Sequence, residues 1–289
     1  MPAPKTMPAP TPQPPLDEAP GATARPGDRA ASRVLPVHSE YVDDRQFATT
    51  LARGLELLRC FTHQRPVLGN KDLAERCGLP PSTVTRLAYT LVSLGYLAET
   101  ETYGKYRLGP AVLSLGYPLL ASFGVRRVAK PLMIELAEEV NGAVALGIRD
   151  RLDIVYIEVA RADNRSAHTV DTGTTHPIAG TAIGRAYLAA CDTHTRQSII
   201  NQIRVKAPDQ WQRWGKAVQR NLQHYPQHGV CTSLGEVFPD VQAVATPLGR
   251  LREGELAVLN CAFVGVPIDE EWLLKSVGPK LLALARRLA

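Results

Sequence analysis

Cysteine is scarce in this sequence, and the few cysteines stand far apart. The five lie at positions 60, 77, 191, 231 and 261 and form no CxxC pair and no Cys/His metal-binding pattern. This spacing excludes the common zinc motifs. Isolated cysteines of this kind usually serve as small buried apolar residues in a protein of a reducing compartment. We therefore expect no bound metal.

Long apolar runs are also lacking. No stretch approaches the ~18 to 20 apolar residues that span a bilayer, and the N-terminus is rich in proline instead of showing a basic and then apolar signal peptide. These absences predict a cytoplasmic protein with no membrane partner. Residues 1–44 hold ten of the 23 prolines and almost no large apolar side chains, so we expect a disordered tail there.

Motifs for catalysis are missing as well. The sequence has no GxSxG elbow, no GxxxxGK phosphate loop, no HExxH and no GxGxxG after a strand. We expect neither an enzyme nor a bound cofactor. Scattered Cys, His and Asp residues can still assemble in space, and turnover of a small acid by a chain lacking residues 1–109 would reveal an enzyme.

The clearest pattern that is present runs over residues 70–97 and predicts two short helices joined by a tight turn. The first would begin with Asn70 as N-cap and stop at Gly78, a residue suited to the left-handed C-terminal position. Pro80 and Pro81 would start the second, with Ser82 as a cap. One buried stripe is expected on it, at Val84, Leu87, Ala88, Leu91 and Leu94.

The opposite face of the second helix is small and polar, and a hairpin follows it. Residues 96–99 and 105–108 read as its two strands around a turn at Gly104. Hydroxyl, phenol and guanidinium groups contact phosphates and base edges. The predicted DNA-binding residues are Ser82, Thr83, Thr85, Arg86 and Tyr89 on the helix and Lys105 and Arg107 on the hairpin wing. A purely structural helix pair gives a similar pattern and remains an alternative.

Charge is distributed unevenly along the chain. Residues 1–44, 45–130 and 131–289 carry net charges of −2, +7 and 0, so the positive excess lies on the segment proposed to meet DNA. Before the helix pair, residues 50–61 place Leu51, Leu55, Leu58 and Phe61 on one face, which predicts a helix packed beneath that pair.

The remaining sequence predicts a linker and then a domain of mixed helix and strand. Pro110 opens a helix with Val112, Leu115 and Leu119 on one side, and we expect a kink or break at Pro118 and a second helix after Pro131. Strands are expected at 143–149, 154–160, 166–171, 241–246 and 256–264, and helices at 181–190, 193–203, 209–224 and from 269. Pro226 should break the helix between His224 and His228, so zinc binding there is not expected.

Several motifs together resemble the IclR family of bacterial transcription regulators. They cover residues 47–288 and read TLARGLELL, LPPSTVTRLAYTLVSLGYL, KYRLGP, LSLGY, PLMIELAEEVNGAVALGIRDRLDIVYIEVAR, HPIAGTAIGRAYLAA and VQAVATPL. The resemblance implies an α+β chain in which an N-terminal winged helix-turn-helix is joined by a linker helix to a GAF-like effector-binding domain. We expect a tail at 1–44, the DNA-binding domain at 45–109, the linker at 110–130 and the effector domain at 131–289.

The resemblance further implies the function and its partners. The chain would be a ligand-responsive regulator that binds a pseudo-palindromic double-stranded DNA operator as a homodimer or a dimer of dimers. It would sense a small organic acid, such as an aromatic acid, to control a catabolic operon. A sensor module acting through protein partners is the alternative, and it would make the exposed face of the second helix dispensable.

The resemblance also places the effector. It implies a pocket at Arg165, His168, Ala182, Ile183, Ser233, Val241, Ala243, Asn260 and Ala262. Arg165 or His168 can neutralise a carboxylate and backbone amides near Gly180 to Ala182 can hold its oxygens, but Arg165 can equally be a solvated loop residue. Gly180 and Gly184 can equally serve close packing of helix on sheet.

Overall fold

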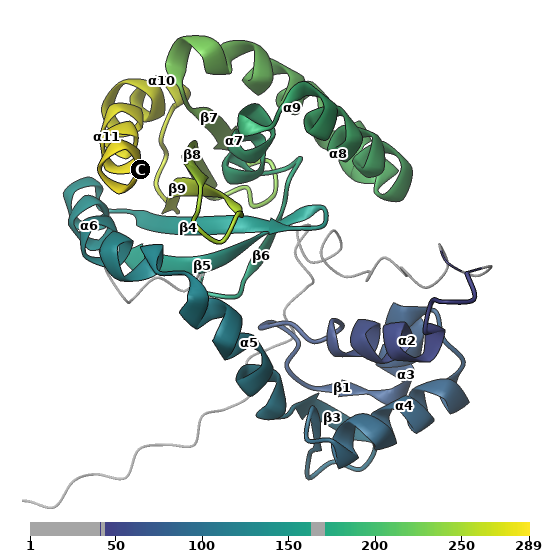
Figure 1. Cartoon of the computed structure of the whole chain (residues 1–289). Helices are drawn as coiled ribbons and strands as arrows, with labels where there is room; N and C mark the ends of the chain where they lie inside the picture. The colour runs from purple at the N-terminus through teal and green to yellow at the C-terminus, as the bar shows by residue number, and fades with distance from the viewer. Residues whose placement is uncertain (1–40, 42–43, 163–170) are drawn as a thin grey trace, which may run out of the picture.

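The structure is a computed structural model that describes residues 41, 44–162 and 171–289. A small N-terminal part and a larger C-terminal part are joined through one helix, α5 (Ala111–Ser122) (Figure 1). The predicted tail lies outside the described residues apart from positions 41 and 44. No helix in the described part of the chain is long and apolar enough to cross a membrane.

The N-terminal part is a winged helix-turn-helix. Its helices are α2 (Thr49–Leu58), α3 (Asn70–Cys77) and α4 (Pro81–Ser93). Its strands are β1 (Leu68–Gly69), β2 (Leu97–Glu99) and β3 (Lys105–Leu108), paired antiparallel in the order β1-β3-β2. A single cluster around Leu57, Leu73 and Val84 forms the core between the three helices and the wing.

Helix α2 packs through a different face from the predicted one. Leu51 and Leu55 expose 64% and 49% of their surface, whereas Leu57 and Gly54 are buried. Gly54 leaves a notch that Leu87 of α4 fills. The predicted stripe was therefore wrong at two of its four positions, because the close approach of α4 at the glycine sets the rotation of the helix.

The helix boundaries also differ from prediction at three places. Gly69, not Asn70, is the N-cap of α3, and it donates its amide to the Asp72 carboxylate at 2.9 Å. Ser82 lies inside α4, which starts at Pro81. Leu94, predicted to be buried, is the exposed C-cap residue. The predicted stop at Gly78 is confirmed by its left-handed φ of 63°.

The linker helix does not break where the prolines stand. Helix α5 continues through Pro118, and α6 (Val125–Val140) includes Pro131 instead of starting after it. The break falls at Phe123, whose ψ of 86° leaves the helical region while its side chain is buried in the C-terminal core. Burial of this aromatic ring, and not the missing proline hydrogen bond, therefore decides where the chain turns.

The C-terminal part is built on one antiparallel sheet of six strands. These are β4 (Ala143–Asp150), β5 (Asp153–Arg161), β6 (Thr175–Pro177), β7 (Cys231–Leu234), β8 (Val241–Arg250) and β9 (Leu256–Val264). Their order is β6-β5-β4-β9-β8-β7. The predicted β4–β5 hairpin is confirmed, β7 was not predicted, and most of the strand expected at 166–171 lies outside the described residues.

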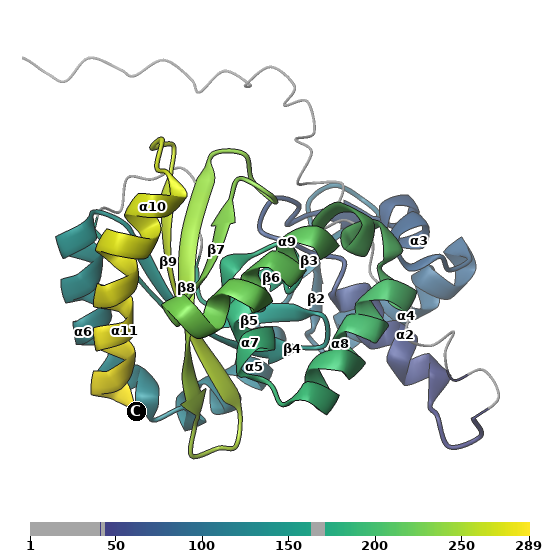
Figure 2. The same ribbon diagram turned by 90° about the horizontal axis from the view of Figure 1, so that it is seen from above.

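Helices cover both faces of this sheet (Figure 2). On one face lie α6, α10 (Glu270–Trp272), a π-helical turn (Leu273–Val277) and α11 (Gly278–Leu288). On the other lie α7 (Ala182–Ala190), α8 (Thr193–Lys206) and α9 (Pro208–His228). Two apolar clusters fill the two gaps, and alternate strand residues such as Val144 and Ala145 point into opposite clusters. The predicted α+β class is confirmed.

Two further expectations concern histidine and cysteine. Helix α9 continues through Pro226 to His228, so the predicted break there was wrong. Pro226 stands in the last turn, where the loss of a single backbone hydrogen bond to the preceding turn leaves the rest of the helix in place. In the described residues no group of side chains is arranged to hold a metal ion. All five cysteines are buried and free, as predicted, although the Sγ atoms of Cys60 and Cys77 meet at 3.1 Å.

Candidate functional site

The outward face of α4 presents the polar groups predicted to contact DNA. Ser82, Thr85, Arg86 and Tyr89 are exposed, with Tyr89 at 75%, and Thr83 is half-buried. On the inward face Val84, Ala88 and Leu91 hold the helix in the core. The hydroxyl of Thr85 donates to the Pro81 carbonyl at 3.0 Å. The helix is therefore anchored by residues other than those that are free to bind.

The wing adds two cations beside this helix. Strand β3 alternates so that Tyr106 is buried in the core while Lys105 and Arg107 are exposed. Both can reach phosphate oxygens of a duplex that α4 enters, since such contacts come from flexible basic side chains. All seven predicted DNA-binding residues thus lie on α4 or on the wing, and none of them is fully buried in the core.

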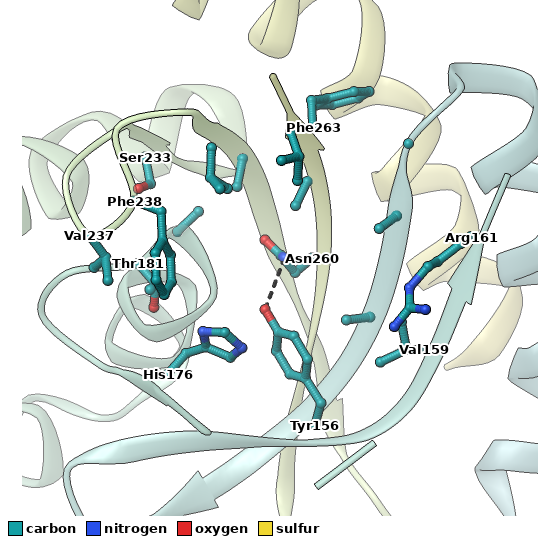
Figure 3. Close-up of a pocket in the computed structure, with 18 of the residues that line it drawn as sticks. Tyr156, Val159, Arg161, His176, Thr181, Ser233, Val237, Phe238, Asn260 and Phe263 are labelled. Carbon is teal, nitrogen blue, oxygen red and sulfur yellow. Dashed lines mark hydrogen bonds between the residues drawn. The ribbon is translucent and has the colours of Figure 1, made fainter. Parts of the chain in front are cut away.

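A pocket opens on the α7 side of the C-terminal sheet, between strands β4, β5, β8 and β9, the start of α7 and the segment after β7 (Figure 3). Its volume is about 250 Å³. Six residues predicted for effector binding line it: Ala182, Ser233, Val241, Ala243, Asn260 and Ala262. Four segments that are far apart in the sequence therefore meet at one cavity.

Other predicted effector residues are not found there. Ile183 does not line the pocket: it is buried in the cluster between α7 and the sheet, because it lies one position further round the helix than Ala182. Arg165 and His168 lie outside the described residues. Lining residues that the prediction missed include Tyr156, Arg161, His176 and Phe238.

The floor of the pocket holds a neutral polar group. The Asn260 amide donates from Nδ2 to the Tyr156 hydroxyl at 3.2 Å, and Oδ1 of Asn260 is buried without a hydrogen-bond partner. The His176 ring stacks at 4.5 Å on that of Tyr156. Burial lowers the pKa of His176 to about 4 and raises that of Tyr156, so both side chains are uncharged near pH 7.

A buried ion pair fixes one wall of the pocket. Arg185 of α7 is fully buried and donates to the carbonyls of Ala179 and Thr232 and, at 2.9 Å, to the Glu236 carboxylate. Burial opposes the charge of Glu236, but Arg185 and hydrogen bonds from Ser233, Arg185 and the Leu234 amide outweigh it and lower the pKa of this carboxyl. The segment with Val237 and Phe238 is thereby held over the cavity.

The glycines at the start of α7 serve close packing. A Cβ on Gly180 would lie 2.6 Å from Val237, and one on Gly184 would lie 2.2 Å from the carbonyl oxygen of Ile178. Thr181 caps the helix by accepting the Gly184 amide at 3.3 Å. Close packing accounts for both glycines, but against Val237 and Trp214 and against the Ile178 backbone instead of the sheet, while Thr181 and Ala182 still border the pocket.

Comparison with known proteins accounts for both parts of the chain. The model of the IclR helix-turn-helix domain matches residues 50–101, and that of the C-terminal domain of the bacterial transcriptional regulator IclR matches residues 118–289. The chain belongs to the IclR family. It is therefore a DNA-binding transcription regulator that responds to a ligand, in a family whose characterised members here are regulators and not enzymes.

Individual relatives agree with this membership. The HTH-type regulator TsaQ1/TsaQ2 of Comamonas testosteroni is 37% identical over 80% of this chain and 84% of its own length. An IclR-family regulator from Brucella abortus is similar in structure, with a TM-score of 0.76 and 40% identity over 85% of this chain and 93% of that one. An IclR homologue from Microbacterium hydrocarbonoxydans, complexed with 4-hydroxybenzoate, shares the fold at 21% identity and a TM-score of 0.59, over 82% of this chain and 99% of that one.

Proposed function

We propose that this regulator binds a pseudo-palindromic operator as a homodimer or a dimer of dimers, and that a small aromatic acid in the C-terminal pocket controls that binding. The target would be a catabolic operon for such acids. The observation that supports the proposal best is the presence, in one chain, of an exposed polar recognition face on α4 and a separate small pocket lined by residues between Asn141 and Val266. We propose the limits 45–109, 110–130 and 131–289 for the DNA-binding, linker and effector units.

The DNA contact rests on charge and exposure together. The segment 45–130 has a net charge of +7, whereas 131–289 is neutral. Because binding to a duplex releases counterions as phosphates are neutralised, this excess favours the N-terminal part as the surface that meets DNA. The first turns of α4 would enter the major groove and read base edges, and Lys105 and Arg107 would hold the adjacent backbone.

The dimer rests on the linker helix. Along α5, Leu113, Leu115, Tyr117 and Leu119 each expose 61–77% of their surface, and no residue of the helix is buried. A helix that is apolar on its exposed side needs a covering partner in water. A second copy of α5 satisfies this need, and it also pairs two DNA-binding domains, as a two-fold operator with half-sites about one helical turn apart requires.

Two observations support an aromatic acid as the effector: the composition of the pocket and the ligand of one relative. The lining is largely apolar with a few polar side chains, which is the usual composition of a small-molecule site. A homologue with the same fold was crystallised with 4-hydroxybenzoate. These observations favour an acid of one ring over a sugar, which would need many more hydrogen-bonding groups.

The test uses the full chain and the promoter of the operon next to its gene. Light scattering should give a dimer or a tetramer at micromolar concentration, and gel shift should require both half-sites. One acid from a panel of benzoates and short aliphatic acids should change the operator affinity. Ala182→Trp, which fills the pocket, should abolish that response, and Asn201→Trp on the exposed face of α8 should keep it. A monomer that binds a single half-site, or no response to any acid, would contradict the proposal.

A further inference from the structure

Arg161 is a charged side chain for which the described residues supply no counter-ion. It is the last residue of β5 and lines the pocket, and its Nε and Nη2 atoms are buried with no hydrogen-bond partner in the described structure. A buried guanidinium normally pairs with a carboxylate or carbonyls, because desolvation of an unpaired charge costs free energy. A missing partner at the wall of a cavity points to a ligand that supplies one.

A bulge in β5 explains why this side chain faces the pocket. The register shifts between Leu146 and Gly147, so that Leu146 pairs with Glu158 and Gly147 with Tyr156. Without the shift, strict alternation would put Tyr156 and Arg161 on opposite faces of the sheet. The extra residue, Ile157, moves Arg161 onto the same face as Tyr156, and both line the cavity.

The same bulge turns the Glu158 carboxylate away from the pocket. Glu158 points to the other face of the sheet, where Arg126 and Lys130 of α6 bind it at 2.8 and 3.3 Å. No aspartate or glutamate lines the pocket among the described residues. Arg161 is thus the one formally charged side chain of the described lining, since His176 is neutral. The cavity has a net charge of about +1 near pH 7.

A second unpaired polar atom lies nearer the middle of the cavity, on Asn260 (Figure 3). Figure 3 shows Arg161 and Val159 on one side and His176, Thr181 and Phe238 on the other, with Asn260 and Tyr156 between them. Nδ2 of Asn260 donates to the Tyr156 hydroxyl, and Oδ1 of Asn260 is a buried acceptor that receives no hydrogen bond in the described structure. A hydroxyl on the ligand could donate the missing hydrogen bond to Oδ1 of Asn260. The cavity therefore matches an anion at the Arg161 side and a neutral hydrogen-bond donor nearer its middle, at Asn260 (Figure 3).

The volume limits the size of the ligand. A dry cavity of ~150 Å³ is known to hold one benzene ring. The pocket has about 250 Å³, which adds room for a carboxylate and a hydroxyl but not for a second ring.

We propose that Arg161 binds the carboxylate of a single-ring aromatic monocarboxylic acid and that Asn260 accepts a hydrogen bond from a hydroxyl on the same ring. The guanidinium forms two parallel hydrogen bonds to the carboxylate oxygens, the arrangement that arginine favours. A dicarboxylate would place its second charge among neutral groups, so the site selects monoanions. This inference rests on the proposed function, in which the pocket holds the effector.

Calorimetry on the full-length protein tests the anchor with 4-hydroxybenzoate, benzoate, terephthalate and the neutral 4-hydroxybenzamide. The affinity should be highest for 4-hydroxybenzoate and lower for benzoate, and terephthalate should bind at least ~10-fold more weakly than benzoate. Arg161→Gln should weaken both monoacids by ~10- to 100-fold, the usual effect of losing hydrogen bonds to a charged group, and should leave the neutral amide within about 3-fold. Arg161→Lys should fall between, and Arg252→Gln, at the exposed β8–β9 turn, should change nothing.

A second variant tests the other end of the ligand. In Asn260→Ala the affinities for 4-hydroxybenzoate and benzoate should become about equal, since only the ring hydroxyl of 4-hydroxybenzoate loses its acceptor. Circular dichroism should show Arg161→Gln folded, because the variant removes a charge that no described residue neutralises.

The outcomes separate this inference from the function on which it rests. If Ala182→Trp abolishes binding of the monoacids but Arg161→Gln does not weaken it, the acid binds in the pocket through another group and the anchor is wrong. If terephthalate binds as well as benzoate, the selection of monoanions is wrong. If no acid binds to the wild-type protein, the proposed function itself fails.

Discussion

The recognition helix and the effector pocket use polar side chains in opposite ways. On α4, Arg86 and Tyr89 project into solvent, and the core beneath them consists of Val84, Ala88 and Leu91. Around the pocket, buried polar groups bind each other, Arg185 with Glu236 and Asn260 with Tyr156, and among the described residues Arg161 is the exception. The first set can change without disturbing the fold, whereas the second set also holds the fold together.

This difference teaches where specificity can vary at low cost. Operator preference depends on exposed side chains whose replacement leaves the core intact. The pocket is shaped in part by groups whose desolvation is balanced by their partners, so substitution of Glu236 or Asn260 should affect stability and binding together, unlike substitution of Arg161.

The largest effect is expected from Glu236→Ala. Removal of the carboxylate leaves Arg185, fully buried, with a charge that nothing neutralises, and such a loss costs about 3–5 kcal/mol. The acid should also bind more weakly, since Val237 and Phe238 lose the contact that positions them. Urea unfolding followed by tryptophan fluorescence is the measurement, because the three tryptophans, at 211, 214 and 272, all lie in the C-terminal part.

The matched control is Glu271→Ala. Its ion pair with Lys275 is exposed on both sides, so its loss should cost less than about 0.5 kcal/mol. Equal stability of the Glu236→Ala and Glu271→Ala proteins would show that the pocket wall does not depend on the buried pair.

An intermediate effect is expected on DNA from Arg86→Ala. Loss of a guanidinium that contacts the operator should cost on the order of 1–3 kcal/mol of specific binding energy. The helix content and the unfolding midpoint should be unchanged, because Arg86 is exposed. Gel shift on the operator, with circular dichroism as control, measures both. Unchanged operator affinity in the folded variant would remove Arg86 from the interface.

The smallest effect is expected from pH. Burial lowers the pKa of His176 to about 4, below its unfolded value of about 6.5, so its contribution to stability is complete above pH 6.5 and is lost as the pH falls toward 4. Between pH 7.5 and 5.5 the wild type should lose about 1 kcal/mol more than His176→Gln. Burial, and then the charge of Asp150, raise the pKa of Asp153 to about 6. Asp153 therefore changes the stability with pH in the opposite direction, but it does so equally in the wild type and in His176→Gln. Parallel urea titrations at the two pH values that gave equal losses would refute this assignment.

The winged helix-turn-helix was predictable from sequence because its signals are local. Gly78 marks the turn, the α4 stripe follows at helical spacing, and the wing comes directly afterwards. The errors there concern tertiary contacts: the rotation of α2 is set by Leu87 packing on Gly54, which spacing alone does not encode. Similarly, the break at Phe123 depends on a core that is formed by residues much later in the chain.

The pocket was predictable only in part. Six of its residues follow from family resemblance, because the motifs around Ala182, Val241 and Asn260 mark its elements. Arg161 was missed because the bulge at Ile157 inverts the alternation from which strand faces are read. Glu236 was missed because its partner, Arg185, lies 51 residues away and forms no sequence pattern with it. A charge inside the apolar α7 was the one available signal.

The two regions must exchange free energy if the ligand is to control transcription. A contact between them exists at the tip of the β4–β5 hairpin, where Asp150 binds Arg59 after the end of α2 at 2.5 Å. The same two strands extend from this tip to the pocket, where β5 carries Tyr156 and Arg161 and β4 carries Ala145. Ligand-dependent shifts of the hairpin therefore have a direct route to the DNA-binding domain.

The most direct test is to measure the affinity of the protein for the acid with and without operator DNA. Our account predicts a change of at least about 5-fold, the lower end of typical coupling between sites, and an equal factor when the acid is added to the operator complex. In the Ala182→Trp protein, adding the acid should leave the operator affinity unchanged. A wild-type protein that binds the acid in the pocket with the same affinity whether or not the operator is bound would contradict the account.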